Sequence, residues 1–289
     1  MSKKDLVVKD IPKAPAFLKN KGLASFEEFA GGLTQGMPLP VLSIRGKVFR
    51  VRKSGEEINL KMQELPFVLV AARKNLSKRF YEDSYVSGEV VAPTCMSVDG
   101  ITPDVADPVA ASCTSCPHNA WGSKITQAGK KGKLCSDYKR VVAWIIGTDT
   151  PVVLDLPATS LKAPKAERGQ GYMMYADYMG QLVKNQMDPT TVVTVAGFTD
   201  AEYPQLWMNF DRYVTEKEYA TVQEYRAMPE VEEVLSQAVT EGDTEVTTAA
   251  EPEPKPEPKP EPKPEPEPDE VVEDADEAAV LAELKSLLG

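Results

Sequence analysis

Residues 41–53 read VLSIRGKVFRVRK, a run that mixes β-branched residues with bases around Gly46. This composition favours a β-strand over a helix. Apolar runs of strand length recur further along the chain, at 67–72 (FVLVAA), 141–146 (VVAWII), 152–156, 191–198 and 205–210 (QLWMNF). The sequence therefore predicts a fold in which strands dominate.

One helix is expected among these strands. Over residues 170–187 the large apolar side chains recur at helical spacing, at Tyr172, Tyr175, Met179, Leu182 and Val183. Residues 91–138 are instead rich in Pro, Gly and Cys, which is typical of a loop or a metal-binding module. We therefore predict a mainly β, α+β fold with a few helices. The length and the single inserted helix fit an OB-like small barrel.

The chain divides into a body and an extended tail. Ser25 and Glu28 form a capping-box pattern that predicts a short helix within an N-terminal arm. Residues 251–268 carry Pro at every second position, which predicts a polyproline-II spacer about 55 Å long at ~3.1 Å per residue. The expected segments are an arm with a short helix (1–35), an OB-like nucleic-acid-binding body including the Cys-rich loop (36–228), a helix or linker (229–250), the spacer (251–268) and an acidic amphipathic tip (269–289).

Acidic residues are concentrated in the tail. The whole chain has a net charge of −11, but residues 241–289 hold 16 acidic and 4 basic residues, whereas the body holds 28 and 29. A disordered acidic tail is thus attached to a body of charge +1. Its tip carries apolar side chains on one helical face, which we predict to bind partner proteins: Leu281, Leu284, Leu287 and Leu288.

The compartment follows from two absences in the sequence. The first residues, MSKKDLVVKDIPKAP, contain no apolar segment of a secretory signal, and no run approaches the ~18 apolar residues of a membrane span. We therefore expect a soluble protein of a reducing cytoplasm, in which cysteines bind metal more often than they form disulfides. A single His also argues against His-centred triads and His-rich metal sites.

The four cysteines have the spacing of a metal site. Cys95 precedes a Cys-x-x-Cys pair, Cys113 and Cys116, by 17 residues, and Cys135 follows after 18 more. A Cys-x-x-Cys turn and two flanking thiolates can bind one structural Zn²⁺, and four protein ligands leave no open position for catalysis. His118 could replace one cysteine. The alternatives are an ordinary buried thiol at Cys95 or Cys135, an iron–sulfur cluster, or a redox Cys-x-x-Cys.

Basic and aromatic residues form two groups that favour binding of single-stranded nucleic acid. Cations neutralise phosphates, and exposed aromatic rings stack on unpaired bases. Tyr81 and Trp121 are the expected stacking residues, whereas Phe49, Phe80 and Trp144 are expected in the core. The first group is Arg45, Lys47, Arg50, Arg52, Lys53, Lys78, Arg79 and Tyr81, and the second is Trp121, Lys124, Lys130, Lys131, Lys133, Tyr138, Lys139 and Arg140.

The chain also resembles a known family. Residues 76–85 (LSKRFYEDSY), 93–104 (PTCMSVDGITPD), 113–123 (CTSCPHNAWGS) and 132–142 (GKLCSDYKRVV) are similar to bacteriophage single-stranded DNA-binding proteins. The resemblance covers about residues 65–160 and the tail arrangement. It implies a role without catalysis in phage DNA replication or recombination in a bacterial host. It further implies that the tail recruits phage or host replication and recombination proteins.

Charge alone adds a regulatory expectation, because an acidic tip on a leash can occupy a cationic groove until a polyanion displaces it. Two other functions remain open at this point. One is a zinc-containing adaptor that contacts proteins of the replication or transcription machinery and no nucleic acid. The other is a Mg²⁺-dependent nuclease that uses Asp99, Asp104 and Asp107.

Overall fold

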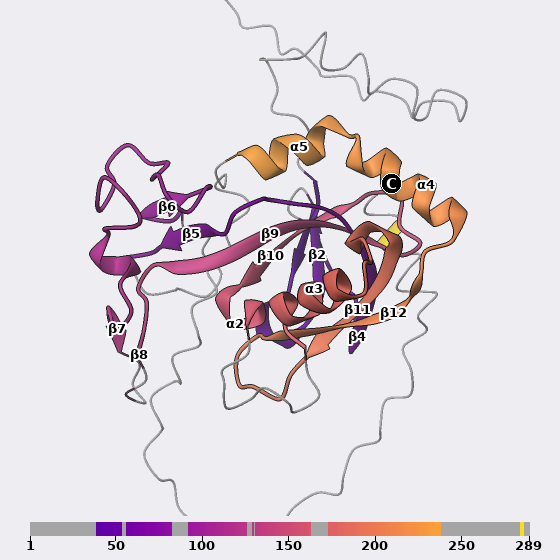
Figure 1. Ribbon diagram of the computed structural model, residues 1–289, viewed down its shortest axis with the longest axis horizontal. Coiled ribbons are helices and arrows are strands. Elements are labelled where there is room, and N and C mark those ends of the chain that lie inside the picture. The colour runs from indigo at the N-terminus through magenta and orange to yellow at the C-terminus, as the bar shows by residue number, and fades with distance from the viewer. Residues whose placement is uncertain are drawn as a thin grey trace, which may run out of the picture. The chain divides into compact units, whose positions relative to one another are not determined.

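The computed structural model describes residues 39–53, 56–82, 92–125, 129, 131–162, 173–237 and 284–285. These residues form a mixed α+β fold of mostly strands (Figure 1). The strands are β1 (Val41–Ser43), β2 (Arg50–Lys53), β3 (Glu56–Asn59), β4 (Glu64–Ala72), β5 (Ser77–Phe80), β6 (Cys95–Ser97), β7 (Lys124–Ile125), β8 (Lys131–Gly132), β9 (Ser136–Ile145), β10 (Val152–Pro157), β11 (Val192–Phe198) and β12 (Leu206–Tyr213). The α-helices are α2 (Ala158–Leu161), α3 (Tyr175–Lys184), α4 (Glu216–Arg226) and α5 (Pro229–Ser236).

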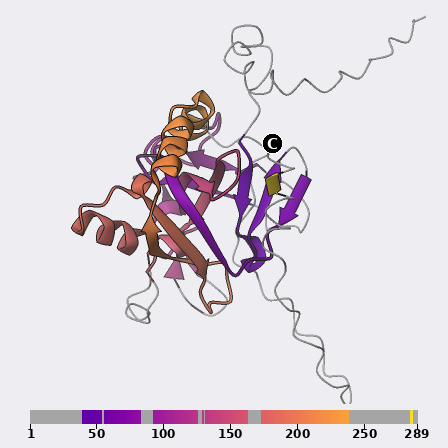
Figure 2. The same cartoon turned by 90° about the vertical axis from the view of Figure 1, so that its right-hand side faces the viewer.

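One curled sheet organises this part of the chain. Its main path runs β12-β11-β4-β9-β10-β1-β2-β3, and the turned view in Figure 2 shows its curvature. Neighbours along the path are antiparallel except β1 and β10, which are parallel. β5 leaves the path by pairing with the start of β9 and with β6, while β7 and β8 form a separate hairpin. The cysteine-rich segment is therefore attached to the sheet through β5 and β9.

The sheet separates two apolar layers because its strands alternate their side chains between the two faces. One layer contains Phe49, Leu154 and Tyr178 and is closed by α2 and α3. The other contains Val142 and Trp144 and is closed by α4 and α5. Helices thus cover both faces of the strands that carry the longest apolar runs (Figure 1).

The predicted apolar runs are strands, and the α+β class with mostly strands is confirmed. The helix predicted over 170–187 is present as α3 within its described residues, and Tyr178 and Leu182 form its buried face. The run 41–53 is not one strand, because Gly46 and Lys47 take positive φ angles of 65° and 58° in a 3-10 turn between β1 and β2. That turn reverses the chain and pairs Val41 with Arg52.

Several elements carry weak sequence signals and were not predicted. β3 and β5 read EEIN and SKRF and are defined by their partners across the sheet, not by an apolar run. α4 has a polar composition, and it begins at a capping box in which the side chains of Thr215 and Glu218 each bind the other's backbone N–H.

Some expectations fall on residues that are not described. They are the helix near Ser25, the spacer 251–268 and most of the tip. Within the described part of the chain, no helix has the length and apolar character that crossing a bilayer requires.

Candidate functional site

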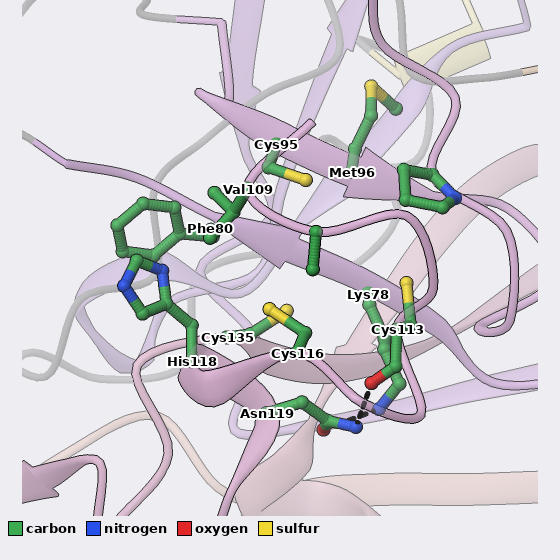
Figure 3. Close-up of a pocket in the computed structure, with 12 residues that line it drawn as sticks. Lys78, Phe80, Cys95, Met96, Val109, Cys113, Cys116, His118, Asn119 and Cys135 are labelled. Atoms are coloured by element: carbon green, nitrogen blue, oxygen red, sulfur yellow. Dashed lines mark hydrogen bonds between the residues drawn. The ribbon is translucent and has the colours of Figure 1, made fainter. Parts of the chain in front are cut away.

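All four cysteines line one small cavity of about 10 Å³ (Figure 3). Cys95 begins β6, Cys113 and Cys116 flank a turn that leads into a 3-10 helix at Pro117–Asn119, and Cys135 immediately precedes β9. The fold thus brings together thiols that lie up to 40 positions apart in the sequence. Cys95, Cys113 and Cys135 are buried, and Cys116 is half-buried.

The thiols are free and share one electrostatic environment. Burial raises the pKa of Cys135 to about 12, which the Lys78 ammonium opposes and the neighbouring thiols of Cys113 and Cys116 reinforce. Burial likewise raises the pKa of Cys113, with a smaller contribution from Cys95. Among the described residues, however, no three His, Cys, Asp or Glu side chains stand in an arrangement that could hold a metal ion. The donor set suits Zn²⁺, but the sulfur atoms would have to move closer together to bind it.

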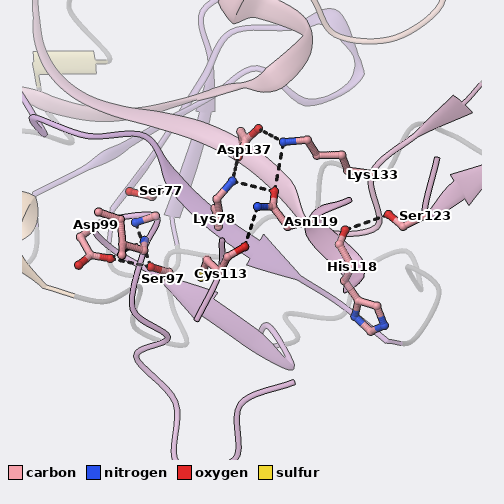
Figure 4. Close-up of polar contacts among 12 residues, drawn as sticks. Ser77, Lys78, Ser97, Asp99, Cys113, His118, Asn119, Ser123, Lys133 and Asp137 are labelled. Carbon is pink, nitrogen blue, oxygen red and sulfur yellow. Dashed lines mark hydrogen bonds and ion pairs between the residues drawn. The ribbon is translucent and has the colours of Figure 1, made fainter. Parts of the chain in front are cut away.

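A polar network braces one side of the cavity (Figure 4). The Lys78 ammonium forms an ion pair with Asp137 and donates to Oδ1 of Asn119 at 3.0 Å. Lys133 contacts the same two residues, at 3.0 Å from Oδ2 of Asp137 and 3.1 Å from Oδ1 of Asn119. Asn119 in turn donates to the carbonyl of Cys113 at 2.7 Å. The network connects β5, β9 and the Cys-x-x-Cys turn. It thereby gives the described residues of the segment 95–135, which we call the cysteine module, a defined orientation on the sheet.

His118 also lines the cavity. Its ring lies 4.3 Å from the Phe80 ring, centroid to centroid, and its carbonyl accepts from the backbone N–H of Cys135 at 2.9 Å. Its Nδ1 is buried without a hydrogen-bond partner among the described residues. His118 therefore serves packing and backbone pairing in this arrangement, and its ring remains a possible substitute ligand.

Predicted cations from both sequence groups meet at a second cavity. Arg45, Arg52, Arg79 and Arg140 line a space of about 30 Å³ together with Asp155. Arg45 and Arg52 come from the β1–β2 hairpin, Arg79 from β5 and Arg140 from β9. Three segments separated by 27 or more positions thus place guanidinium groups around one space.

Other predicted cations are placed elsewhere. Arg50 pairs with Glu57 at 3.4 Å, and Lys78 and Lys133 belong to the network beside the cysteines. Lys139 binds the backbone carbonyls of Arg73 and Lys74, and burial lowers the pKa of its ammonium. Lys124 and Lys131 lie on the exposed β7–β8 hairpin. Lys47 and Lys53 are half-buried in the β1–β2 region, and Lys130 lies outside the described residues.

The predicted aromatic residues separate clearly by exposure. Trp121 is 74% exposed, whereas Tyr138 is 1% exposed and lies under the Arg79 guanidinium, 4.6 Å from ring centroid to Cζ. Tyr81 is half-buried, and burial raises the pKa of its hydroxyl. Of the three, only Trp121 presents a whole ring face to solvent. Phe49, Phe80 and Trp144 are buried, as expected.

The acidic residues weighed for Mg²⁺ organise turns. Oδ1 of Asp99 accepts from the backbone N–H groups of Ile101 and Thr102 at 2.7 and 2.8 Å, and these bonds lower the pKa of its carboxyl. Asp104 accepts from the backbone N–H of Val98 at 2.6 Å, and Asp107 is exposed. Asp99 and Asp104 thus hold turns together through backbone hydrogen bonds, and the Mg²⁺ role of the three acids stays a prediction.

Of the tip leucines, only Leu284 is described. It is 1% exposed and belongs to the apolar layer closed by α2 and α3, which we call the main apolar layer, whereas its neighbour Lys285 is exposed. Leu281, Leu287 and Leu288 lie outside the described residues, so their predicted contact with partner proteins stays a prediction. The burial of Leu284 means that this side chain contacts the body of its own chain.

Two residues at these sites were not singled out from the sequence: Asp155, which pairs with Arg140, and Asn119, which joins the lysines to Cys113. Arg73, which lies in the first basic segment of the sequence, binds the carbonyls of Leu235 and Gln237 at the C-terminal end of α5. An acid inside the apolar run VVLDLP was the available signal for Asp155, since burying a carboxylate requires a charged partner.

Comparison with known proteins yields no relative. No family model, no curated protein and no solved structure matches this chain.

Proposed function

We propose that this protein binds single-stranded DNA without sequence preference and acts in phage DNA replication or recombination, without catalysing a reaction. In this proposal the curled sheet is an OB-like body, and its basic surface contacts the DNA backbone. The phage context comes from the sequence resemblance. The binding mode is supported by the exposure and charge of the residues described above.

The observation that carries the proposal is the exposed indole of Trp121. An aromatic ring that is 74% exposed gains nothing from burial in its own fold, although it can stack on an unpaired base. The backbone N–H of Gly122 donates to Gly132 at 2.8 Å, which joins the Trp121 turn to the β7–β8 hairpin carrying Lys124 and Lys131. The exposed ring that we propose to stack on bases is therefore joined to cations that could neutralise phosphates.

Zinc is the proposed cofactor, as one structural ion per chain held by Cys95, Cys113, Cys116 and Cys135. Support comes from the chemistry of the donors, because four cysteines line the same cavity and four thiolates are a complete ligand set for structural zinc once the sulfur atoms move closer together. Bound zinc would fix the turn that precedes Trp121. The ammonium groups of Lys78 and Lys133 would offset part of the negative charge of four thiolates.

The acidic tail is proposed to regulate this binding and to recruit phage or host replication and recombination proteins. Leu284 supports the first role, because its burial shows that this one position of the tip contacts the body. The acidic residues around it would then oppose the approach of a polyanion.

Titration of the full chain with oligothymidylate, followed by tryptophan fluorescence, tests the proposal. Three tryptophans contribute to the signal, but Trp144 is buried with its Nε1 bound to the Thr148 carbonyl at 2.8 Å. Quenching is expected in the natural chain and should be largely lost in Trp121→Phe, because the exposed indole is the one that can stack. Tyr219→Phe is the control, since Tyr219 is exposed on α4, away from the cysteine module.

The opposite results are equally informative. No quenching and no retention of a labelled oligomer at low salt would refute the proposal and favour the protein-binding adaptor. Degradation of the oligomer with Mg²⁺ would refute the absence of catalysis and favour the nuclease.

A further inference from the structure

The cavity lined by arginines lies where four strands meet. Val41 pairs directly with Arg52 between β1 and β2, and with Val153 between β1 and β10. Arg140 pairs directly with Asp155 between β9 and β10. The cavity is therefore bounded by paired strands and by the turn that carries Arg45, and not by loops alone. Side chains that point into it start from rigid positions.

The charge of the lining is strongly positive. Four arginines, Arg45, Arg52, Arg79 and Arg140, line the cavity together with one acid, Asp155, and two of them, Arg79 and Arg140, form ion pairs with that acid. Each of these arginines also has contacts of its own within the chain. The site is therefore defined by the net positive charge around the cavity and not by unpaired arginines. A small cavity with low-dielectric walls concentrates such a potential.

Asp155 shows how this potential acts on an anion. Burial, the largest influence, acts to raise the pKa of its carboxyl, but Arg140, Arg79 and Arg73 together lower the pKa below its ordinary value. The surroundings thus stabilise a negative charge even where water is largely excluded. The same surroundings disfavour a further positive charge, because burial and the nearby Arg140 lower the pKa of the Arg73 guanidinium.

The two buried arginines are held in place before any ligand arrives. Nε and Nη2 of Arg140 donate to the two oxygens of Asp155 at 2.8 and 3.0 Å, while Arg79 stacks on Tyr138 and lies 3.6 Å from Asp155. Arg79 is 5% exposed and Arg140 is 1% exposed. Arg45 and Arg52 are half-buried and form the more accessible part of the lining. Such preorganisation lowers the entropy cost of binding.

We propose that this cavity is an oxyanion site that binds one phosphate group. This inference rests on the proposed function, in which the phosphate group belongs to the backbone of the bound DNA strand. Guanidinium groups suit this ligand because their planar donor forks match phosphate oxygens. The volume of about 30 Å³ has room for about two waters, or for part of a tetrahedral oxyanion that enters from the open side. The site would anchor the strand to the sheet, whereas Trp121 stacks its bases on the cysteine module.

Inorganic phosphate is the first probe, added to the full chain in isothermal titration calorimetry at constant ionic strength with chloride as the competing anion. Saturable binding is expected in the natural chain. Arg52→Gln and Arg45→Gln should each weaken it about tenfold or more, because each removes a charge-assisted hydrogen bond. Lys184→Gln is the control, since it removes one charge from an exposed position on α3 and should leave phosphate binding unchanged. Arg45 and Arg52 are chosen because they are not fully buried, and melting curves check that the variants fold.

A titration with oligothymidylate separates this inference from the proposed function. Weaker binding of both phosphate and oligomer in Arg52→Gln supports the whole proposal. Phosphate binding without any oligomer binding would keep the oxyanion site and refute the proposed function. Oligomer binding that is unaffected in both arginine variants, together with no saturable phosphate binding, would refute the site and leave the function intact.

Discussion

Arg140 and Asp155 face each other directly across the β9–β10 pair, and both nitrogen–oxygen contacts of their ion pair lie within 3.0 Å. Arg140 is 1% exposed and its Nη1 lies 3.5 Å from the Val234 carbonyl of α5, whereas 14% of the Asp155 side chain stays exposed. This geometry links the register of the sheet to the charge of the cavity. One carboxylate orients the guanidinium, and the surrounding arginines keep that carboxylate ionised.

Asp155→Ala is expected to lower the free energy of unfolding by about 3–5 kcal/mol, because Arg140 then stays buried without its carboxylate. Urea denaturation at pH 7 measures the change. The double variant Arg140→Met/Asp155→Leu should recover part of the loss, since apolar side chains at these two positions need no charged partner, whereas buried Arg79 still lacks its contact with Asp155. A double variant less stable than Asp155→Ala would contradict this account.

Glu218→Gln is expected to cost about 1 kcal/mol at neutral pH, because Glu218 caps α4 and accepts both Arg212 nitrogens at 2.8 Å. These hydrogen bonds from Arg212, more than any other cause, lower the pKa of Glu218 from 4.5 to about 2. A carboxyl with a lowered pKa stabilises the fold above its unfolded pKa and loses that effect as the pH falls. The difference in stability between the natural chain and Glu218→Gln should thus be constant above pH 5 and should decrease as the pH falls toward 2.

Thermal melts of both proteins over this pH range provide the measurement. Glu224→Gln, at an exposed position of the same helix, is the control. A difference that persists unchanged at pH 2 would show that the ion pair is not its source.

Lys131 and Lys133 lie two residues apart, but we expect their replacement by alanine to have different effects on DNA binding and on stability. Lys131 is exposed on β8, so Lys131→Ala should reduce the slope of log affinity for oligothymidylate against log salt by about 0.7 and leave the melting temperature unchanged. Lys133 binds Asp137 and Asn119, so Lys133→Ala should loosen the cysteine module. Fluorescence titrations at several salt concentrations and melting curves give the two readouts, and an unchanged slope in Lys131→Ala would remove the hairpin from the interface.

Leu284→Ala is expected to destabilise the body by about 2–3 kcal/mol, because it deletes a side chain that is 1% exposed within the main apolar layer. Lys285→Ala, at the exposed neighbouring position, should have no effect. Urea denaturation of the two variants tests this expectation. Equal stability of both would mean that the tip contributes nothing to the core.

Deletion of residues 241–289 should tighten binding to oligothymidylate at low salt if the acidic tail competes with the strand. The same deletion should lower stability, because Leu284 is lost with the tail. Binding that is no tighter at low salt would refute the autoinhibition.

Metal analysis of the purified chain is expected to find one zinc per molecule, and Cys135→Ser should remove it. Ser115→Ala is the matched control, since Ser115 lies beside Cys116 but is exposed and does not line the cavity. Chelation should increase hydrogen exchange within residues 95–135 and leave β10 and β11 protected. Iron in place of zinc would favour the cluster alternative, and absence of any metal would refute the site.

The strands rich in apolar residues and helix α3 could be predicted because alternation and helical spacing are local properties of the chain. β5 could not, since SKRF becomes a strand only through its pairing with β6 and β9. The capping box of α4 was readable as Thr215 and Glu218, but the polar composition of the helix concealed it. Trp121 was predicted to be exposed from its polar neighbours, whereas Tyr138, in a similarly basic segment, is buried under Arg79.

Local composition and spacing were enough to predict the strand-rich class, the division into a neutral body and an acidic tail, and a metal site at the four cysteines, which stays a prediction. Which cations lie together depends on the pairing of strands that are far apart in the sequence. Arg45, Arg79 and Arg140 meet because strand pairing, parallel between β1 and β10 and antiparallel between β5, β9 and β10, brings distant segments to one point of the sheet, while Arg50 and Lys133 are occupied by acids nearby. Charge along a chain is a local property, but the potential in a cavity depends on distances that pairing alone sets.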